Sequence, residues 1–168
     1  MEYAIGLAAD GLLVLVLLIA VFTLFFRVPS GVKRYDIYSR IIMAGVSSYM
    51  FAKLVALVFQ PDGLRPFEKL GLEPGAAYLD NPGFPSDHAL FALFLTLAVW
   101  FAIRDRRLAI VMATLTIVMS LARVLALVHT PLDIAGGFVF AFMGALWYLN
   151  DGSKLLFAPS QIRKKVVK

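Results

Sequence analysis

Long apolar runs alternate with short polar segments along the chain. The runs lie near residues 3–26, 41–59, 87–103, 108–128 and 131–149. A helix needs about 20 predominantly apolar residues to cross the hydrocarbon core of a bilayer, and each run is close to that length. We therefore predict an all-α fold: a polytopic membrane protein with a bundle of about five transmembrane helices, in which residues 1–168 form one integral membrane domain.

The segments between the runs are predicted to be loops. Residues 27–40, "RVPSGVKRYDIYSR", indicate a basic loop, and residues 60–87 indicate a structured loop rich in proline, glycine and acids. Residues 152–168 are predicted to form a basic C-terminal tail. The first run has no basic segment before it and no small-residue cleavage site after it, so we expect a retained helix rather than a signal peptide.

The composition supports a membrane protein and excludes several kinds of site. Apolar residues make up 61% of the chain, against roughly 45–50% in soluble domains, and 16% of the residues are charged. The chain has no cysteine, which excludes disulfides and thiolate metal sites. The net charge of +5 is typical of a membrane protein with basic cytoplasmic loops, so we predict no nucleic-acid partner.

The basic residues predict the orientation of the helices. Of the sixteen Lys and Arg residues, four lie in 27–40, three in 104–107 and five in the tail. Five spans place these three segments on the same side of the membrane, which the positive-inside rule makes cytoplasmic. We therefore predict an N-terminus outside and a C-terminus inside.

Polar residues gather at the opposite ends of the predicted helices. They are Lys53, Arg65, Ser86, Asp87, His88, Arg123, His129 and Asp133. Ionisable residues within membrane spans are costly and are a functional hypothesis by default. Three cations and two histidines suit phosphate, because a guanidinium can bind two phosphate oxygens at once.

Two helix starts belong to this cluster. Ser86 is predicted to cap the third helix, and Thr130 the fifth, with Pro131 at the first helical position. The N-terminus of a helix presents unpaired N–H groups and a positive dipole end to an anion.

The spacing of the two histidines suggests a division of roles. Asp133 follows His129 by four residues and is close enough to accept a hydrogen bond from one imidazole nitrogen. Such a bond would fix the tautomer and leave the other nitrogen free to attack phosphorus. His88 could then donate a proton to the leaving oxygen.

These motifs resemble a known family. "FPSDHA" (84–89) and Arg123-x5-His129-x3-Asp133 followed by "IAGG" resemble the type 2 phosphatidic acid phosphatase (PAP2) superfamily of lipid phosphatases. Its usual pattern is Lys-x6-Arg-Pro, Pro-Ser-Gly-His and Ser-Arg-x5-His-x3-Asp. The resemblance implies that His88 is the acid, that His129 becomes phosphorylated and that Asp133 supports it. It also implies phosphate binding by Lys53, Arg65, Arg123 and Ser86, with no metal and no cofactor.

The chain departs from that pattern at three places. Asp87 replaces the usual Gly, as in the branch that acts on undecaprenyl diphosphate, and we include Asp87 among the phosphate-site residues. Ala122 stands where the pattern has Ser. The pattern places an arginine seven residues after its lysine. In this chain Gln60 stands seven residues after Lys53, and Arg65 stands twelve residues after it. Either Arg65 keeps the arginine role after an insertion or Gln60 replaces it, and we favour Arg65 because a guanidinium binds phosphate better than an amide.

Some of these residues also have purely structural interpretations. Lys53 could extend from a helix end to the interface, Arg123 could bridge to Asp133, and Asp87 could only favour the positive end of its helix. Asp10 stands alone in the first apolar run and is assigned no role.

The sequence therefore predicts a metal-independent phosphatase embedded among membrane lipids. Its predicted substrate is undecaprenyl diphosphate, hydrolysed through a phosphohistidine to undecaprenyl phosphate on the outer face of a bacterial inner membrane. One alternative is hydrolysis of another phospholipid, such as phosphatidylglycerophosphate, phosphatidate or lipid A. An alternative of another class is a non-catalytic lipid-binding or transport protein.

Overall fold

The computed structural model describes residues 2–28, 32–61 and 63–149, and the predicted tail 152–168 lies outside the described residues. All regular secondary structure in these ranges is helical, which confirms the predicted all-α class. The elements are α1 (Glu2–Arg27), α2 (Val32–Val58), α3 (Pro66–Leu70), α4 (Asp87–Ile103), α5 (Arg106–Leu125), α6 (Pro131–Gly144) and the 3₁₀ helix η1 (Ala145–Tyr148).

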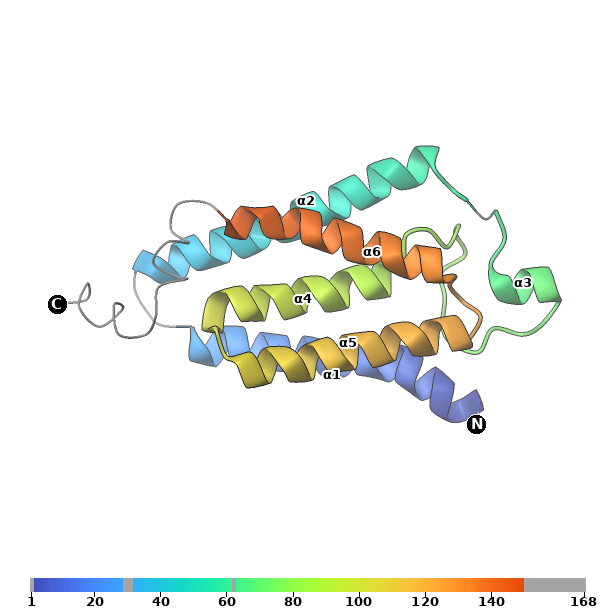
Figure 1. The fold of residues 1–168 in the computed structure, drawn as a ribbon, viewed down its shortest axis with the longest axis horizontal. Helices are drawn as coiled ribbons and strands as arrows, with labels where there is room; N and C mark the ends of the chain where they lie inside the picture. Colours follow the sequence, from blue (N-terminus) through green and yellow to red (C-terminus); the bar gives the residue numbers. More distant parts are fainter. Residues whose placement is uncertain (1, 29–31, 62, 150–168) are drawn as a thin grey trace.

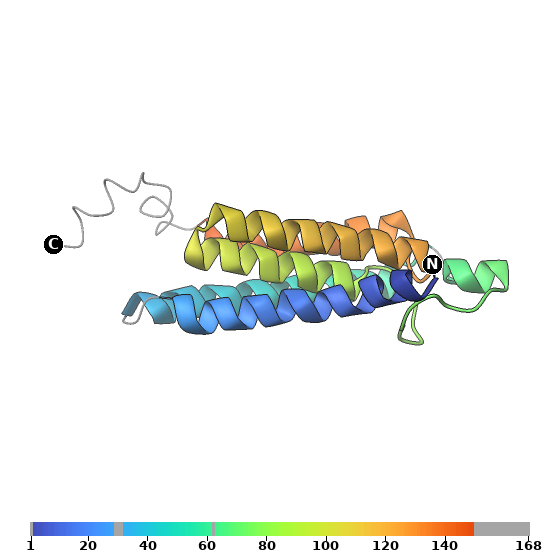
Figure 2. The ribbon, with the colours of Figure 1, turned by 90° about the horizontal axis from the view of Figure 1, so that it is seen from below.

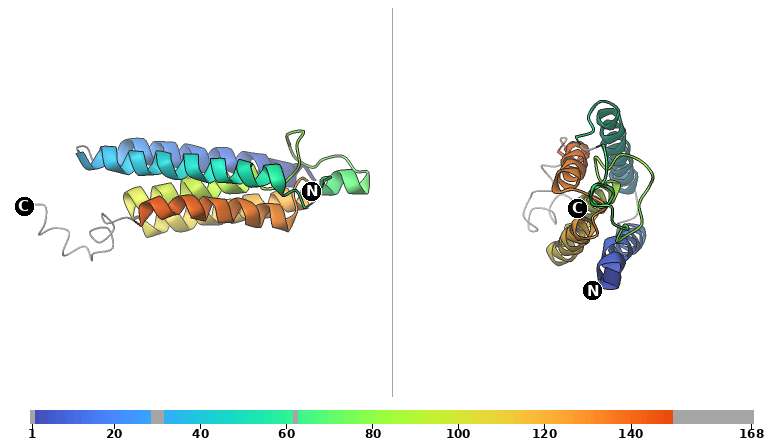
Figure 3. Two further views of the ribbon diagram at one scale, coloured as in Figure 1. Left: turned by 90° about the horizontal axis from the view of Figure 1, so that it is seen from above. Right: turned by 90° about the vertical axis from the view of Figure 1, so that its right-hand side faces the viewer.

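The five longer helices form an elongated bundle with α4 at its centre (Figures 1 and 3). Helix α4 contacts α1, α2, α5 and α6, and the helices run side by side along the long axis of the molecule (Figure 2). Small residues on α4, including Ala89, Ala92 and Ala98, are fully buried, so the neighbouring helices approach it closely. The central position of α4 shields it from the surroundings that the outer helices face.

In the part of the chain that the structure describes, four segments are long and apolar enough to cross a membrane. They are Tyr3–Arg27, Arg34–Val58, Arg106–Leu125 and Pro131–Tyr148, whereas α4 is a shorter apolar helix of 17 residues. Large apolar side chains such as Leu18, Phe22 and Phe25 are exposed on the outer surface. An apolar exterior of this extent is what lipid solvates, so the fold is that of a polytopic helical membrane protein.

The predicted basic loop 27–40 is largely helical, which corrects the start of the second span from 41 to Val32. Polar side chains in this first part of α2 bond back to α1: the Tyr38 hydroxyl donates to the Leu24 carbonyl at 2.7 Å, and Arg34 Nη2 donates to the Phe25 carbonyl at 3.2 Å. These contacts allow a polar sequence to continue the helix beyond the apolar run.

The last two long helices are also bounded differently from the prediction. Helix α5 ends at Leu125 rather than near 128, because Leu127 adopts a left-handed conformation with φ 60°. Helix α6 ends at Gly144 and continues as the 3₁₀ helix η1.

The bundle has two different ends. Arg27, the start of α2 and the turn between α4 and α5 lie at one end, so the described parts of the basic segments 27–40 and 104–107 share it (Figure 1). The other end, which we call the site end, carries α3 and the loop residues 59–61, 63–65, 71–86 and 126–130. Helices α1 and α2 are bonded together at the basic end and diverge toward the site end (Figure 1).

The length of α4 leaves a recess at the site end. Its 17 residues span about 25 Å, whereas the 26 residues of α1 span about 39 Å. Figure 1 shows that α4 begins deeper in the bundle than the adjacent ends of α5 and α6. Ser86 caps α4 as predicted, since its Oγ accepts from the Ala89 N–H at 3.4 Å.

The start of α4 packs directly onto α6. The Ser86 N–H donates to the Asp133 carbonyl at 2.9 Å. A Cβ at Gly137 would lie 2.6 Å from the Ser86 carbonyl oxygen and 3.0 Å from the Leu90 nitrogen. Phe84 is buried against Leu90 and Phe140, which anchors the loop that leads into α4. A glycine at position 137 is therefore required for the close approach of α6 to the start of α4.

We predict that Gly137→Ala lowers the midpoint of thermal unfolding in detergent by at least ~3 °C, because the methyl group meets backbone atoms and overpacking costs about 1–3 kcal/mol. The matched control is Gly11→Ala in α1, where the added Cβ meets only the Leu7 side chain, at 3.5 Å. That control should be neutral or slightly stabilising, since Ala favours a helix over Gly. Equal midpoints for the two variants would contradict the close α4–α6 contact.

Candidate functional site

A cavity of about 560 Å³ occupies the recess at the site end. Its charged and titratable lining residues come from α2, α4, α5 and the loops before α3 and α6, and they include Lys53, Arg65, Asp87, His88, Arg123 and His129. Apolar lining comes from Leu57 of α2 and from Leu79, Phe84 and Pro85 of the long loop. The structure thus brings both histidines and the three predicted cations to one space.

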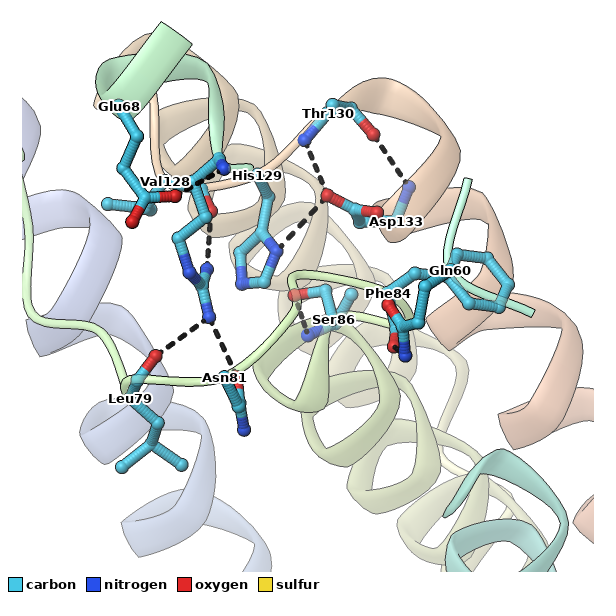
Figure 4. A network of polar contacts seen from close by, with 12 residues as sticks. Gln60, Glu68, Leu79, Asn81, Phe84, Ser86, Val128, His129, Thr130 and Asp133 are labelled. Atoms are coloured by element: carbon cyan, nitrogen blue, oxygen red, sulfur yellow. Dashed lines mark hydrogen bonds and ion pairs between the residues drawn. The ribbon is translucent and has the colours of Figure 1, made fainter. Parts of the chain in front are cut away.

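His129 lies in the short loop before α6, with Asp133 behind it. His129 Nδ1 is 3.5 Å from Asp133 Oδ2, an ion-pair distance longer than an ideal hydrogen bond. The same carboxylate oxygen accepts the Thr130 N–H at 2.7 Å, and the Thr130 hydroxyl accepts the Asp133 N–H at 3.2 Å. The predicted cap at Thr130 is confirmed, and it fixes Asp133 against the histidine. Figure 4 shows the other ring nitrogen pointing away from Asp133.

The protein environment favours the neutral form of His129, whose side chain is 5% exposed. Burial lowers the pKa of His129 from its ordinary value of 6.5, and the nearby Arg123 and Arg65 add to that effect. Asp133 opposes it by favouring the proton. A neutral imidazole held by Asp133 on one side keeps a lone pair available on the other.

His88, in the first turn of α4, faces Arg123. Arg123 Nη1 is 3.4 Å from His88 Nε2. Because arginine can only donate, Nε2 is the acceptor in this contact, and a neutral ring would carry its proton on Nδ1. A general acid must carry a proton that it can give up. His88 can therefore act as an acid only when its ring is protonated.

Arg123 is held by a residue for which the sequence suggested no role. Its Nη1 donates to Asp10 Oδ1 at 2.6 Å, and Arg123 is 1% exposed. The predicted structural alternative, a bridge from Arg123 to Asp133, is replaced by this contact with Asp10. The signal was present in the sequence, because a lone acid in a membrane span is costly without a partner.

Two buried guanidinium nitrogens in the site have no partner in the protein. Nε of Arg123 and Nε of Arg65 are both inaccessible and make no hydrogen bond. Unpaired buried donors are rare in folded proteins, and both arginines line the cavity. An anion in the cavity is the kind of ligand that such donors suit.

Arg65 also fastens the loops of the site end together. Its Nη1 donates to the Val128 carbonyl at 2.6 Å, and its Nη2 donates to the Leu79 carbonyl at 3.0 Å and to Asn81 Oδ1 at 2.9 Å (Figure 4). Burial lowers the pKa of Arg65 below its ordinary value, and the nearby Asp133 partly offsets this effect.

Gln60, the alternative to Arg65 in the first motif, lines the cavity as well. Its Nε2 donates to the Ala56 carbonyl at 2.7 Å and to the Phe84 carbonyl at 3.1 Å, and its buried Oε1 makes no hydrogen bond. Both Gln60 and Arg65 line the cavity. The assignment of Arg65 to the arginine position of the first motif therefore stays a prediction.

Lys53 and Asp87 form a pair across the cavity. Lys53 Nζ donates to both carboxylate oxygens of Asp87, at 2.8 and 2.9 Å, and lies 5.1 Å from the centre of the Tyr49 ring. The ammonium is thus turned into the site rather than extended toward the interface.

Two predicted positions lie behind the cavity wall. Ser86 is fully buried as the cap of α4 and is not among the lining residues. Ala122 packs with Ala9 and Phe67 in a small apolar cluster, where no hydroxyl is needed. Phosphate binding by Ser86 therefore stays a prediction. Within the described ranges, no three His, Asp or Glu side chains are grouped closely enough to hold a metal ion.

We predict that His129 titrates below pH 6.5, so its neutral form persists as the pH falls through 6.5, because burial and two arginines disfavour the charged ring. The measurement is ¹⁵N NMR of histidine-labelled protein. The chain has two histidines, so His88→Gln assigns the signals. Asp133→Asn should lower the midpoint further by removing the carboxylate that favours the proton. A midpoint at or above 6.5 in the wild type would contradict this electrostatic description.

Comparison with known proteins agrees with the site. The family model of the PAP2 superfamily, whose members are phosphatases acting on phosphate esters, matches residues 11–156. No curated protein and no solved structure matched the chain. The matched range covers α2 to α6, most of α1 and every residue that lines the cavity, whereas Asp10 lies just before it. The chain belongs to the PAP2 superfamily.

Proposed function

We propose that this protein is a membrane lipid phosphatase that works through a phosphohistidine. The observation that carries the proposal is that His88, His129, Lys53, Arg65 and Arg123 line one cavity at the end of an apolar bundle. Phosphoryl transfer needs an aligned nucleophile, a proton donor and fixed positive charge around the transferred group. The residues of the cavity supply all three.

In the first step, Nε2 of His129 attacks the phosphorus atom. An N–P bond forms, and the bond from phosphorus to the leaving oxygen breaks with its electron pair going to that oxygen. Protonated His88 transfers its proton to the leaving oxygen. The Asp133 carboxylate, 3.5 Å from Nδ1, stabilises the positive charge that develops on the His129 ring.

In the second step, water replaces the histidine. Neutral His88 accepts a proton from the water as its oxygen bonds to phosphorus, and the N–P bond breaks to return neutral His129. Inorganic phosphate leaves, and His88 is protonated again for the next turnover. No metal enters this scheme.

The cations stabilise the transferred group. Arg123 and Arg65 line the cavity, and the Nε atom of each is a buried donor without a protein partner. Lys53 can shift from Asp87 to a phosphate oxygen as a flexible point charge. In a site of low dielectric, fixed donors of this kind supply most of the catalysis.

The shape of the bundle suits a lipid substrate. Helices α1 and α2 diverge toward the site end (Figure 1), and a lipid substrate would enter the site from that side. Leu57 and Ala56 line the cavity on the α2 side and can contact the first carbons of a lipid chain. The "PSDH" variant, with Asp87 held on Lys53, leads us to propose undecaprenyl diphosphate, which would yield undecaprenyl phosphate.

We further propose that the site faces the outside of a bacterial inner membrane. The basic segments 27–40 and 104–107 lie at the end of the bundle opposite the cavity, and such segments favour the cytoplasm. Recycling of a lipid carrier after its diphosphate has been released outside would need a site on that face.

Two alternatives are tested alongside this one. Another phosphorylated lipid would use the same residues. A non-catalytic lipid-binding protein is favoured by one observation: Lys53 and Arg65 are occupied by Asp87 and by backbone carbonyls.

The first experiment measures phosphate release in detergent with EDTA present, using undecaprenyl diphosphate, phosphatidylglycerophosphate, phosphatidate and lipid A 1-diphosphate. We expect the fastest release from undecaprenyl diphosphate and a loss of at least ~10⁴-fold in His129→Ala, because the nucleophile is absent. Rapid quenching should trap an acid-labile phosphorylated protein in the wild type and none in His129→Ala. A wild-type protein that is folded and inert on all four lipids would refute the enzyme.

The second experiment separates the two histidines by the leaving group. We expect His88→Ala to slow formation of the phosphorylated protein on the order of 10²–10⁴-fold with phosphatidate, whose leaving alkoxide needs a proton, and much less with a lipid diphosphate, whose leaving phosphate is a weaker base. His129→Ala should be inactive on both. Equal losses for His88→Ala on the two substrates would contradict its role as the acid.

A further inference from the structure

Asp10 reaches the site from the middle of the first half of α1, a helix that contributes no motif residue. Its Oδ1 accepts from Arg123 Nη1 at 2.6 Å, and the same oxygen is 4.0 Å from His88 Nε2. Its Oδ2 accepts the Ala77 N–H at 2.9 Å. One carboxylate therefore contacts an arginine of the cavity, lies near a histidine of the cavity and holds the loop above them.

The contact with Asp10 holds the Arg123 guanidinium at its Nη1 atom. Arg123 is 1% exposed, and a buried cation with no anion beside it would be strongly destabilised. Asp10 accepts a hydrogen bond from Nη1, whereas Nε has no protein partner. The charge of Arg123 is thus compensated by Asp10 while the residue still lines the cavity.

The contact with Ala77 fixes the wall of the cavity. Ala77, Tyr78 and Leu79 all line it, and the Leu79 carbonyl accepts from Arg65. Asp10 and Arg65 therefore hold the same short segment from two sides, so the position of one arginine is linked to the position of the other.

We infer that Asp10 is a positioning residue for the phosphoryl group: it aligns Arg123 and the 77–79 segment for the transition state and does not itself bind the substrate. A carboxylate repels phosphate, which excludes direct binding. The inference rests on the proposed function, and it assigns to α1 a part in catalysis that the motifs do not contain.

The test is Asp10→Asn in the full-length protein, assayed with the best lipid phosphate. The amide keeps the size of the side chain, loses its charge and turns a donor toward Arg123 or Ala77. We expect kcat to fall by roughly 10- to 100-fold, the range expected for a misplaced transition-state donor. Inhibition by inorganic phosphate should be unchanged or stronger, because a negative charge near the anion has been removed. Asp10→Glu should recover part of kcat.

A double variant distinguishes positioning from a general loss of folding. If Asp10 acts through Arg123, Asp10→Asn should lower kcat in the wild type and have little further effect in Arg123→Lys. The matched control is Asp36→Asn at the basic end, where the carboxylate is 61% exposed and pairs with Arg40; its kcat should equal that of the wild type.

The outcomes are separable. Asp10→Asn within twofold of an active wild type, or an equal fold-loss in the Arg123→Lys background, would overturn the inference and leave the phosphatase in place. A folded wild type that releases phosphate from none of the lipids would overturn both.

Discussion

The central helix begins deep inside the bundle, and the site depends on that constraint. Because α4 starts at Asp87, below the ends of α5 and α6, its cap and first turn lie inside a ring of apolar helices. The connecting loops must fold into the recess, where backbone and side-chain polar groups have little water to bond. The cavity and its polar network are the result of satisfying those groups there.

Charge compensation follows from the same constraint. Lys53 is paired with Asp87, Arg123 with Asp10, and Arg65 with carbonyl oxygens of two loops. The two arginines are fixed before a ligand arrives, so they need little reorganisation when negative charge develops on a substrate. The two unpaired Nε atoms are the exception to this compensation, and they lie on residues that line the cavity. The network therefore has a place for one more anion.

The sequence predicted what depends on local spacing. The helical class, the caps at Ser86 and Thr130 and the four-residue interval from His129 to Asp133 are properties of one segment each, and the structure contains all of them. The sequence did not predict the start of α2 at Val32, because the polar first turns are stabilised by bonds to α1 rather than by their own composition.

Contacts between segments that are far apart in the chain could not be predicted from the sequence. Asp10 and Arg123 are 113 residues apart and meet because α1 packs against α5. The bonds of Arg65 to Val128 and Leu79 likewise depend on how two loops close over the recess. The motifs suggested that both arginines bind phosphate, but they did not indicate which groups of the protein hold each arginine. Those partners depend on how the helices and loops pack together.

The most direct test of the account is an experimental structure of the full chain with orthovanadate, a mimic of the transferred phosphoryl group. We predict vanadium bonded to Nε2 of His129, with oxygens within hydrogen-bonding distance of His88 and Arg123. Vanadate bound elsewhere, or a His88 ring that faces away from the bound vanadate, would contradict the proposed roles of the two histidines.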